Sequence, residues 1–213
     1  MRALVFENVY EVEGSQGQSF VRIFRAGLDI GGTVTEEGIS ATEAAYSFLR
    51  SHGQRVIFGV KGMARPMGKR LRLSVIDTMP GRSGAPIPGG LVLWNIDTSM
   101  MKDLIHWRLQ VKPGGPQAFY LHSETAEDYA KHLTAEEKRR NRRGEFEWVK
   151  VHRDNHLFDC EVYAAAMADA ECWGGIGVLP GGGAAKGKRL VSSSQQKPKQ
   201  GPAWLDRNRT GRW

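Results

Sequence analysis

The sequence has few cysteines and no long hydrophobic run. Of its 213 residues only two are cysteine, Cys160 and Cys172, and they do not form a Cys-x-x-Cys pair. A structural zinc site is therefore not expected, and a reducing compartment is the simplest interpretation. No run of about eighteen apolar residues occurs, so we expect no membrane-spanning helix. The N-terminal segment carries an acid, Glu7, among its first ten residues and lacks the apolar region of a signal peptide.

The basic charge is concentrated at the C-terminal end. The formal net charge is +7, and from Gly174 onward there are eight lysines and arginines against one acid, Asp206. The body, residues 1–173, is therefore neutral, and a basic total does not identify it as a nucleic-acid-binding surface. Residues 174–213 are rich in Gly, Ser, Gln, Pro and Lys and are expected to form a flexible, disordered basic tail.

Strand patterns alternate with helix patterns along the body. We expect strands over residues 19–30, 55–62, 90–98, 117–122 and 145–151, and helices over residues 40–53, 99–110, 125–144 and 155–173. Ser40 and Glu43 have the spacing of a capping box. Residues 63–90, which contain several Gly and Pro, are expected to form a long loop or a β-excursion. This alternation predicts an α/β domain with a largely parallel sheet.

The stretch "RAGLDIGGTVTEEG", residues 25–38, leads from a strand pattern into Asp29 and a Gly-Gly-Thr turn. Such a turn lets backbone N–H groups approach a phosphate, as in sugar kinases and actin-like ATPases, and the aspartate beside it can hold Mg²⁺. The carboxylate could equally be a metal ligand at a strand end, or an acid in an ordinary turn.

The kinase hypothesis has little further support in the chain. The segment "GGAAKGKR", residues 182–189, approaches a P-loop, but Arg189 stands where a serine or threonine is required. No other glycine-rich nucleotide loop occurs in a suitable context. Nucleotide binding is therefore the weaker interpretation of Asp29.

A nuclease that uses divalent metals needs carboxylates converging from separate strands and helices. Asp29 is expected to end a strand, and Asp159 lies in the first turns of the apolar helix expected over residues 155–173. An acid on such a helix is costly to bury unless it meets a cation. The alternative is that Asp159 lies at the rim of the helix, in water.

Four segments then carry a resemblance to a known family. They are "AGLDIGGTVTEEGISATEAAYSFLRSHGQRVIFGVKG", "LWNIDTSMMKDLIHWRLQ", "YAKHLTAEE" and "FEWVKVHRDNHLFDCEVYAAAMA". Their order resembles the nuclease domain of the large terminase subunits of lambda-type phages, the DNA-packaging motors. The matching segments span roughly residues 20–173, and the last is the most specific.

The resemblance implies a ribonuclease H-like fold, which is a mixed sheet flanked by helices. It also implies a nuclease domain that cuts concatemeric double-stranded DNA with Mg²⁺ or Mn²⁺. Asp29 resembles that family's acid on the fourth strand, and Asp159 resembles the acid on the final helix; both would hold metal. Lys61 matches a recurring lysine that contacts DNA or phosphate, or it is a solvated strand-end lysine. Asp97 and Glu136 fall in matching segments and are possible further residues near the metals.

The resemblance also implies partners. Arg139, Arg140, Arg142 and Arg143 form the densest basic run of the body, either a DNA contact or a solvated helix end. The family works with a terminase small subunit and docks on the portal of the empty capsid, in the host cytoplasm during phage assembly. Two tryptophans near the end of the tail, in residues 204–213, would suit portal docking or belong to a frayed end.

One departure from the family pattern matters. Nothing before residue 20 matches the family's first strand, which carries another catalytic aspartate, and the ATPase domain has no counterpart. We therefore expect a partial nuclease domain over residues 1–173, from a split gene, a degraded prophage gene or a longer reading frame, that cuts poorly or not at all when isolated. The alternative is a non-catalytic assembly module that docks through its tail.

Overall fold

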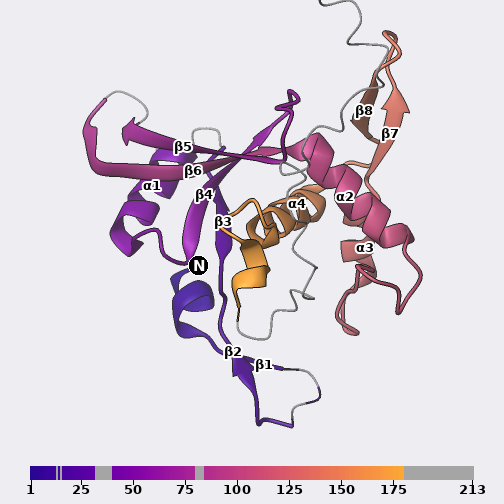
Figure 1. The fold of residues 1–213 in the computed structure, drawn as a ribbon, viewed down its shortest axis with the longest axis horizontal. Coiled ribbons are helices and arrows are strands. Elements are labelled where there is room, and N and C mark those ends of the chain that lie inside the picture. Colours follow the sequence, from indigo (N-terminus) through magenta and orange to yellow (C-terminus); the bar gives the residue numbers. More distant parts are fainter. Residues whose placement is uncertain (13, 15, 32–39, 80–83, 180–213) are drawn as a thin grey trace, which may run out of the picture. The chain divides into compact units, whose positions relative to one another are not determined.

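The computed structural model describes residues 1–179 except 13, 15, 32–39 and 80–83 (Figure 1). The elements follow in the order η1 (Ala3–Glu7, a π-helix), β1 (Tyr10–Glu11), β2 (Phe20–Val21), β3 (Ala26–Asp29), α1 (Ala41–His52), β4 (Ile57–Met63), β5 (Leu71–Thr78), β6 (Pro86–Asp97), α2 (Thr98–Gln110), α3 (Glu127–Leu133), β7 (Glu136–Arg140), β8 (Phe146–Lys150), α4 (His156–Ala168) and η2 (Gly175–Val178, a 3-10 helix).

A four-stranded sheet organises the described residues. Its order is β3-β4-β6-β5, in which β3, β4 and β6 are parallel and β5 runs antiparallel to β6. Asp29 pairs with Val60, and Met63 pairs with Asp97, so the carboxyl ends of the three parallel strands share one edge of the sheet. The predicted mixed sheet flanked by helices is confirmed, and it fits a ribonuclease H-like domain.

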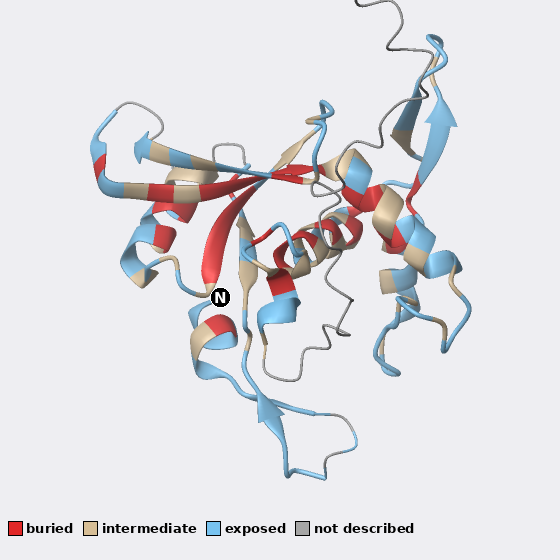
Figure 2. Ribbon diagram, viewed as in Figure 1, coloured by how far each residue is buried: buried red, intermediate tan, exposed pale blue. Residues whose placement is uncertain are grey.

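The two faces of the sheet pack against different helices, as side chains that alternate along each strand require. Phe58 and Val60 of β4 join the core formed with α2 and α4, whereas Ile57 joins the core formed with α1. On β6, Trp94 joins the core formed with α2 and α4, and Leu93 joins the core formed with α1. Figure 2 shows the buried residues concentrated on β4, β6 and the inner surfaces of these helices. Strands buried on both faces explain the near-continuous apolar runs in the sequence.

Helix α1 confirms the helix expected over residues 40–53. Its C-terminal cap is Gly53, whose φ of 65° is a conformation that glycine adopts without steric cost. The expected capping box is wrong, because the side chain of Ser40 makes no capping hydrogen bond. Instead, the hydroxyl of Thr42 donates to the carbonyl of Ile30 at 2.8 Å, which ties the start of α1 to the end of β3.

The helix expected over residues 125–144 is wrong in its second half. Helix α3 ends at Leu133, and β7 and β8 then form an antiparallel hairpin in which Glu136 pairs with Lys150. The turn rests on Asn141, whose side-chain oxygen accepts the N–H groups of Arg143 and Glu145. The high helix propensity of its alanines, glutamates and arginines was overridden by strand pairing and turn chemistry.

Three other boundaries differ from expectation. The strand expected over residues 19–30 is interrupted, because β2 pairs with β1 and only β3 joins the main sheet. Residues 117–122 form no strand; Gln117 has a φ of 66°, and the N–H of Phe119 bonds to the carbonyl of Arg108 near the end of α2. Helix α4 ends at Ala168 rather than at residue 173. The β-excursion expected within residues 63–90 is confirmed as β5.

None of the helices in the described part of the chain is long and apolar enough to cross a bilayer. Several expectations fall outside the described residues. They concern Gly32 and Thr33 of the Gly-Gly-Thr turn, the P-loop-like segment 182–189, and the tail with Trp204 and Trp213.

Candidate active site

Asp29 ends β3 and points toward α4. Side chains two residues apart share a face of a strand, and a Cβ placed on Gly27 would contact Met167 of α4. Oδ1 of Asp29 accepts the N–H of Gly31 at 2.8 Å, which fixes the carboxylate at the strand end. Oδ2 accepts the hydroxyl of Tyr163 at 3.5 Å, a long hydrogen bond that connects β3 to α4.

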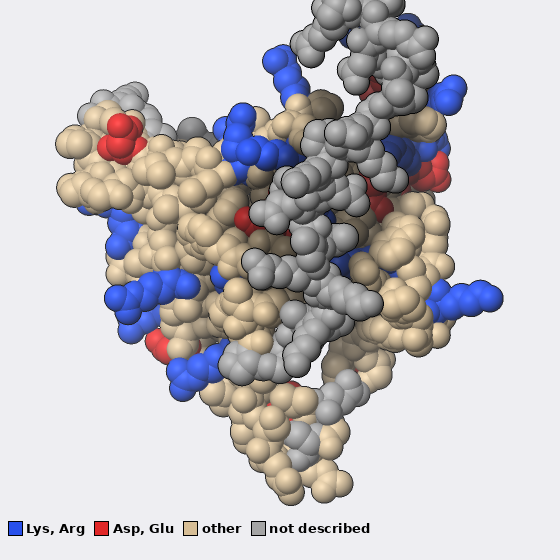
Figure 3. Space-filling model, viewed as in Figure 1, with Lys and Arg blue, Asp and Glu red and all other residues tan. Residues whose placement is uncertain are grey.

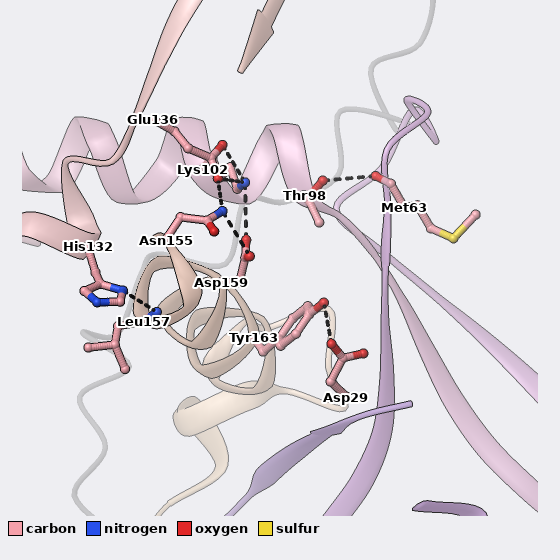
Figure 4. Close-up of polar contacts among 10 residues, drawn as sticks. All are labelled: Asp29, Met63, Thr98, Lys102, His132, Glu136, Asn155, Leu157, Asp159 and Tyr163. Carbon is pink, nitrogen blue, oxygen red and sulfur yellow. Dashed lines mark hydrogen bonds and ion pairs between the residues drawn. The ribbon is translucent and has the colours of Figure 1, made fainter. Parts of the chain in front are cut away.

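Asn155, Asp159 and Tyr163 lie on one face of α4, because residues four apart in a helix are neighbours. The pKa of Tyr163 is raised to about 12, first by burial and then by the negative charges of Asp29 and Asp159. One phenol therefore lies within the electrostatic reach of both carboxylates, and Figure 4 shows it between them.

A cavity of about 460 Å³ lies between β3 and α4, and Asp29 and Asp159 both line it. Asp29 is exposed, and the side chain of Asp159 is 40% exposed, so water and solutes reach both. Arg25 and His156 also line the cavity. The guanidinium of Arg25 donates to the backbone carbonyls of Cys172 and Trp173, which holds it at the wall.

A polar cluster of Lys102, Glu136, Asn155 and Asp159 lies next to this cavity (Figure 4). Nζ of Lys102 is 2.7 Å from each carboxylate oxygen of Glu136 and 3.3 Å from Oδ1 of Asp159. The side-chain amide of Asn155 donates to Glu136 at 2.6 Å and to Oδ2 of Asp159 at 3.3 Å. The cluster ties α2, β7 and the start of α4 together.

Glu136 was expected in a helix and is found at the first position of β7, where it is buried. Burying a carboxylate is costly unless it is paired and hydrogen-bonded, and Lys102 and Asn155 supply both. Glu136 therefore lies close to Asp159 through Lys102, but it does not line the cavity that Asp29 and Asp159 share.

Asp97 is the N-cap of α2 and is 1% exposed. Oδ1 accepts the N–H of Met100 at 3.0 Å, and Oδ2 accepts the N–H of Met67 at 2.8 Å. Both oxygens are thus used by the backbone, and Asp97 does not line the cavity. The structure places this acid in a capping role.

Lys61 lies on β4, one residue after Val60, and is exposed. Because Val60 packs toward α4, alternation places Lys61 on the opposite face, the one that α1 covers. The structure therefore does not bring Lys61 together with Asp29 and Asp159. Its contact with DNA or phosphate stays a prediction.

The arginine run lies on the β7–β8 hairpin and not at a helix end. Arg139 pairs with Glu137 at 2.8 Å, and the guanidinium of Arg140 lies 4.9 Å from the centre of the Phe146 ring. Arg142 and Arg143 lie in the exposed turn. On the face shown in Figure 3, basic side chains are spread over several elements rather than gathered in one patch.

Sequence reasoning did not assign roles to Lys102, Asn155 or Tyr163. Spacing offered a signal for two of them, because Asn155 and Tyr163 each stand four residues from Asp159 on the same helix. Lys102 gave no comparable signal, since its partner Glu136 is 34 residues away and the intervening chain reverses direction.

The donor set of the cavity suits a hard cation, because carboxylate oxygens are preferred by Mg²⁺ and Mn²⁺. Among the residues that the structure describes, no group of three or more His, Cys, Asp or Glu side chains has the arrangement of a complete metal site. Mg²⁺ is commonly held by one or two carboxylates, with water and substrate phosphate completing the shell. Asp29 and Asp159 fit that pattern.

Residues 5–173 match the family model described as terminase large subunit gpA, endonuclease domain. Searches of curated proteins and of solved structures find no match. The matched range contains both acids of the cavity, the polar cluster and the hairpin.

Proposed function

This chain belongs to the family of terminase large subunit gpA endonuclease domains, and we propose that it is a metal-dependent endonuclease of phage DNA packaging. Its substrate would be concatemeric double-stranded DNA in the cytoplasm of the host cell. The terminase small subunit and the portal of the capsid are its proposed partners.

The arrangement of Asp29 and Asp159 carries this proposal. The two acids are far apart in sequence, yet both line one cavity, and both raise the pKa of the same phenol, Tyr163. They also lie on the same face of the sheet, on the side of α4. An endonuclease that activates water with a divalent ion needs such a pair on rigid elements.

Asp29 and Asp159 would hold Mg²⁺ or Mn²⁺, which when bound lowers the pKa of water and stabilises the charge that develops on phosphate. The chain's own groups position these ligands. The N–H of Gly31 orients Asp29, and Asn155 and Lys102 orient Asp159. The adjoining phenol of Tyr163 stays protonated at neutral pH, because its pKa is raised to about 12.

DNA contacts would be mainly to phosphates and independent of sequence. The exposed arginines of the hairpin turn, Arg142 and Arg143, would make such contacts, with Arg139 and Arg140 beside them. Lys61 would contact a different part of the DNA, since it lies on the other face of the sheet.

Cleavage of supercoiled plasmid in the presence of Mn²⁺ tests the proposal. The expected result is weak nicking, as expected of a partial nuclease domain, that requires the metal and is lost in Asp29→Ala and in Asp159→Ala. Asp77→Ala is the matched control, because Asp77 is an exposed acid on β5. Equal cutting by all four proteins, or cutting without metal, would contradict the proposed nuclease function. A chain that neither cuts DNA nor responds to metal, and whose residues 174–213 capture the portal, would be an assembly module.

A further inference from the structure

We propose that the ammonium of Lys102 is a built-in cation at the site. It occupies the position between Glu136 and Asp159 that a second divalent ion would otherwise take, so that the chain binds one divalent ion and not two. This inference rests on the proposed metal-dependent function, and its test separates the two.

Two carboxylates surround the ammonium of Lys102. It donates hydrogen bonds to Oε1 and Oε2 of Glu136, both at 2.7 Å, and it forms an ion pair with Oδ1 of Asp159 at 3.3 Å. The ammonium of Lys102 therefore contacts both oxygens of one acid and one oxygen of a second acid, which is the position of a cation that bridges two carboxylates.

The position of the ammonium is fixed by its surroundings. The side chain of Lys102 is 11% exposed, and its Nζ lies 5.3 Å from the centre of the Phe158 ring. The amide of Asn155 donates to both acids and so holds them at a constant separation. A long lysine side chain on a surface would sample many rotamers, whereas this one is held by packing and by charge.

The positive charge of Lys102 affects Glu136 and Asp159 differently. Lys102 neutralises Glu136, its nearer and more buried partner, and leaves Asp159 with most of its negative charge. Asp159 faces the cavity that it shares with Asp29, which is where a single ion would bind. With an uncharged side chain at position 102, Glu136 and Asp159 would instead form a second pair of hard oxygen ligands.

A second cavity gives solutes access to that pair. It has a volume of about 650 Å³, it lies between the start of α2 and the hairpin, and Lys102 and Glu136 both line it. A divalent ion could therefore reach Glu136 from solvent if the ammonium were absent.

The number of Mn²⁺ ions bound by the full chain, measured by isothermal titration calorimetry and electron paramagnetic resonance, tests the inference. We expect one ion in the wild type, two in Lys102→Met and one in Glu136→Gln. Lys138→Met is the matched control and should bind one, because Lys138 of β7 pairs with Asp103, a half-buried acid of α2, and not with Glu136 or Asp159. Circular dichroism establishes which variants are folded.

Two ions in the wild type would overturn the inference and leave the proposed function standing. A folded Lys102→Met protein that binds no more ions than the wild type would also overturn it. No ion in the wild type but one in Lys102→Met would support the inference and contradict the metal site of Asp29 and Asp159. If Lys102→Met does not fold, the wild type and Glu136→Gln are compared. One bound Mn²⁺ ion in each supports the inference, whereas two ions in the wild type and one in Glu136→Gln overturn it.

Discussion

The phenol of Tyr163 donates a hydrogen bond to the carboxylate of Asp29, 134 residues earlier in the chain. The contact joins the end of β3 to α4, four residues after Asp159 on the same helix face. Its geometry connects the two acids that the proposed function requires, and it makes Tyr163 a positioning residue for Asp29.

Tyr163→Phe should keep the ring packed and remove only the hydroxyl. We expect Mn²⁺ affinity to fall about tenfold, at the lower end of the range for partners that orient metal ligands, because this hydrogen bond is long. Calorimetric titration with Mn²⁺ checks it. Tyr129→Phe is the matched control, since the hydroxyl of Tyr129 on α3 donates to Glu161 on α4, the helix that carries Tyr163. An equal loss of Mn²⁺ affinity in both variants would show an effect on α4 as a whole.

Asp97→Ala should lower the free energy of unfolding by about 2 kcal/mol, because a helix cap is lost and two buried N–H groups lose their acceptor. Mn²⁺ binding should persist in the folded variant. Urea denaturation and titration measure the two effects. Loss of metal binding without loss of stability would show that Asp97 acts at the metal site, and Asp77→Ala should change neither quantity.

Arg142→Ala and Arg143→Ala should each weaken binding to double-stranded DNA of any sequence. Each lost phosphate contact is expected to reduce the slope of log affinity against log salt by about 1. Fluorescence anisotropy at several salt concentrations measures this. Lys131→Ala is the control, because Lys131 already pairs with Glu127 and Asp128; a slope unchanged by the arginine variants would remove the hairpin turn from the DNA-binding surface.

Gly144→Ala distinguishes the hairpin from the helix that composition favours. In the hairpin, Gly144 has a φ of 82°, so an alanine should destabilise the turn by about 1 kcal/mol. Within a helix the same change would stabilise by a similar amount. Hydrogen exchange of the β7 and β8 amides gives the sign, and faster exchange is the expected result.

The parts of the fold that the sequence predicted are those specified by local pattern. Apolar runs located β4 and β6, and the residues from Ser40 to Gly53 gave α1 with its glycine cap. Asp29 was placed at a strand end because an apolar run stops there. Asp97 was predicted near the metals and not as a cap, although the signal for a cap was local, since it precedes Thr98 and Ser99 at the start of α2.

The parts that escaped prediction depend on tertiary contacts. Residues 125–144 have a helical composition, and only strand pairing with β8 from Glu136 onward makes their second half part of a hairpin. Lys102 and Glu136 come from different elements, and neither residue type in its own segment indicates a buried ion pair. The site was thus predictable where one helix or one strand end carries it, and not where three elements meet.

We propose that Asp29 and Asp159 hold one divalent ion together, and a double-mutant cycle on Mn²⁺ affinity measures whether they do. Wild type, Asp29→Ala, Asp159→Ala and the double variant would be titrated under identical conditions. We expect that either single change lowers the Mn²⁺ affinity at least about tenfold and that the double change adds little. Additive losses, or a single variant with wild-type affinity, would show that the two acids do not share an ion.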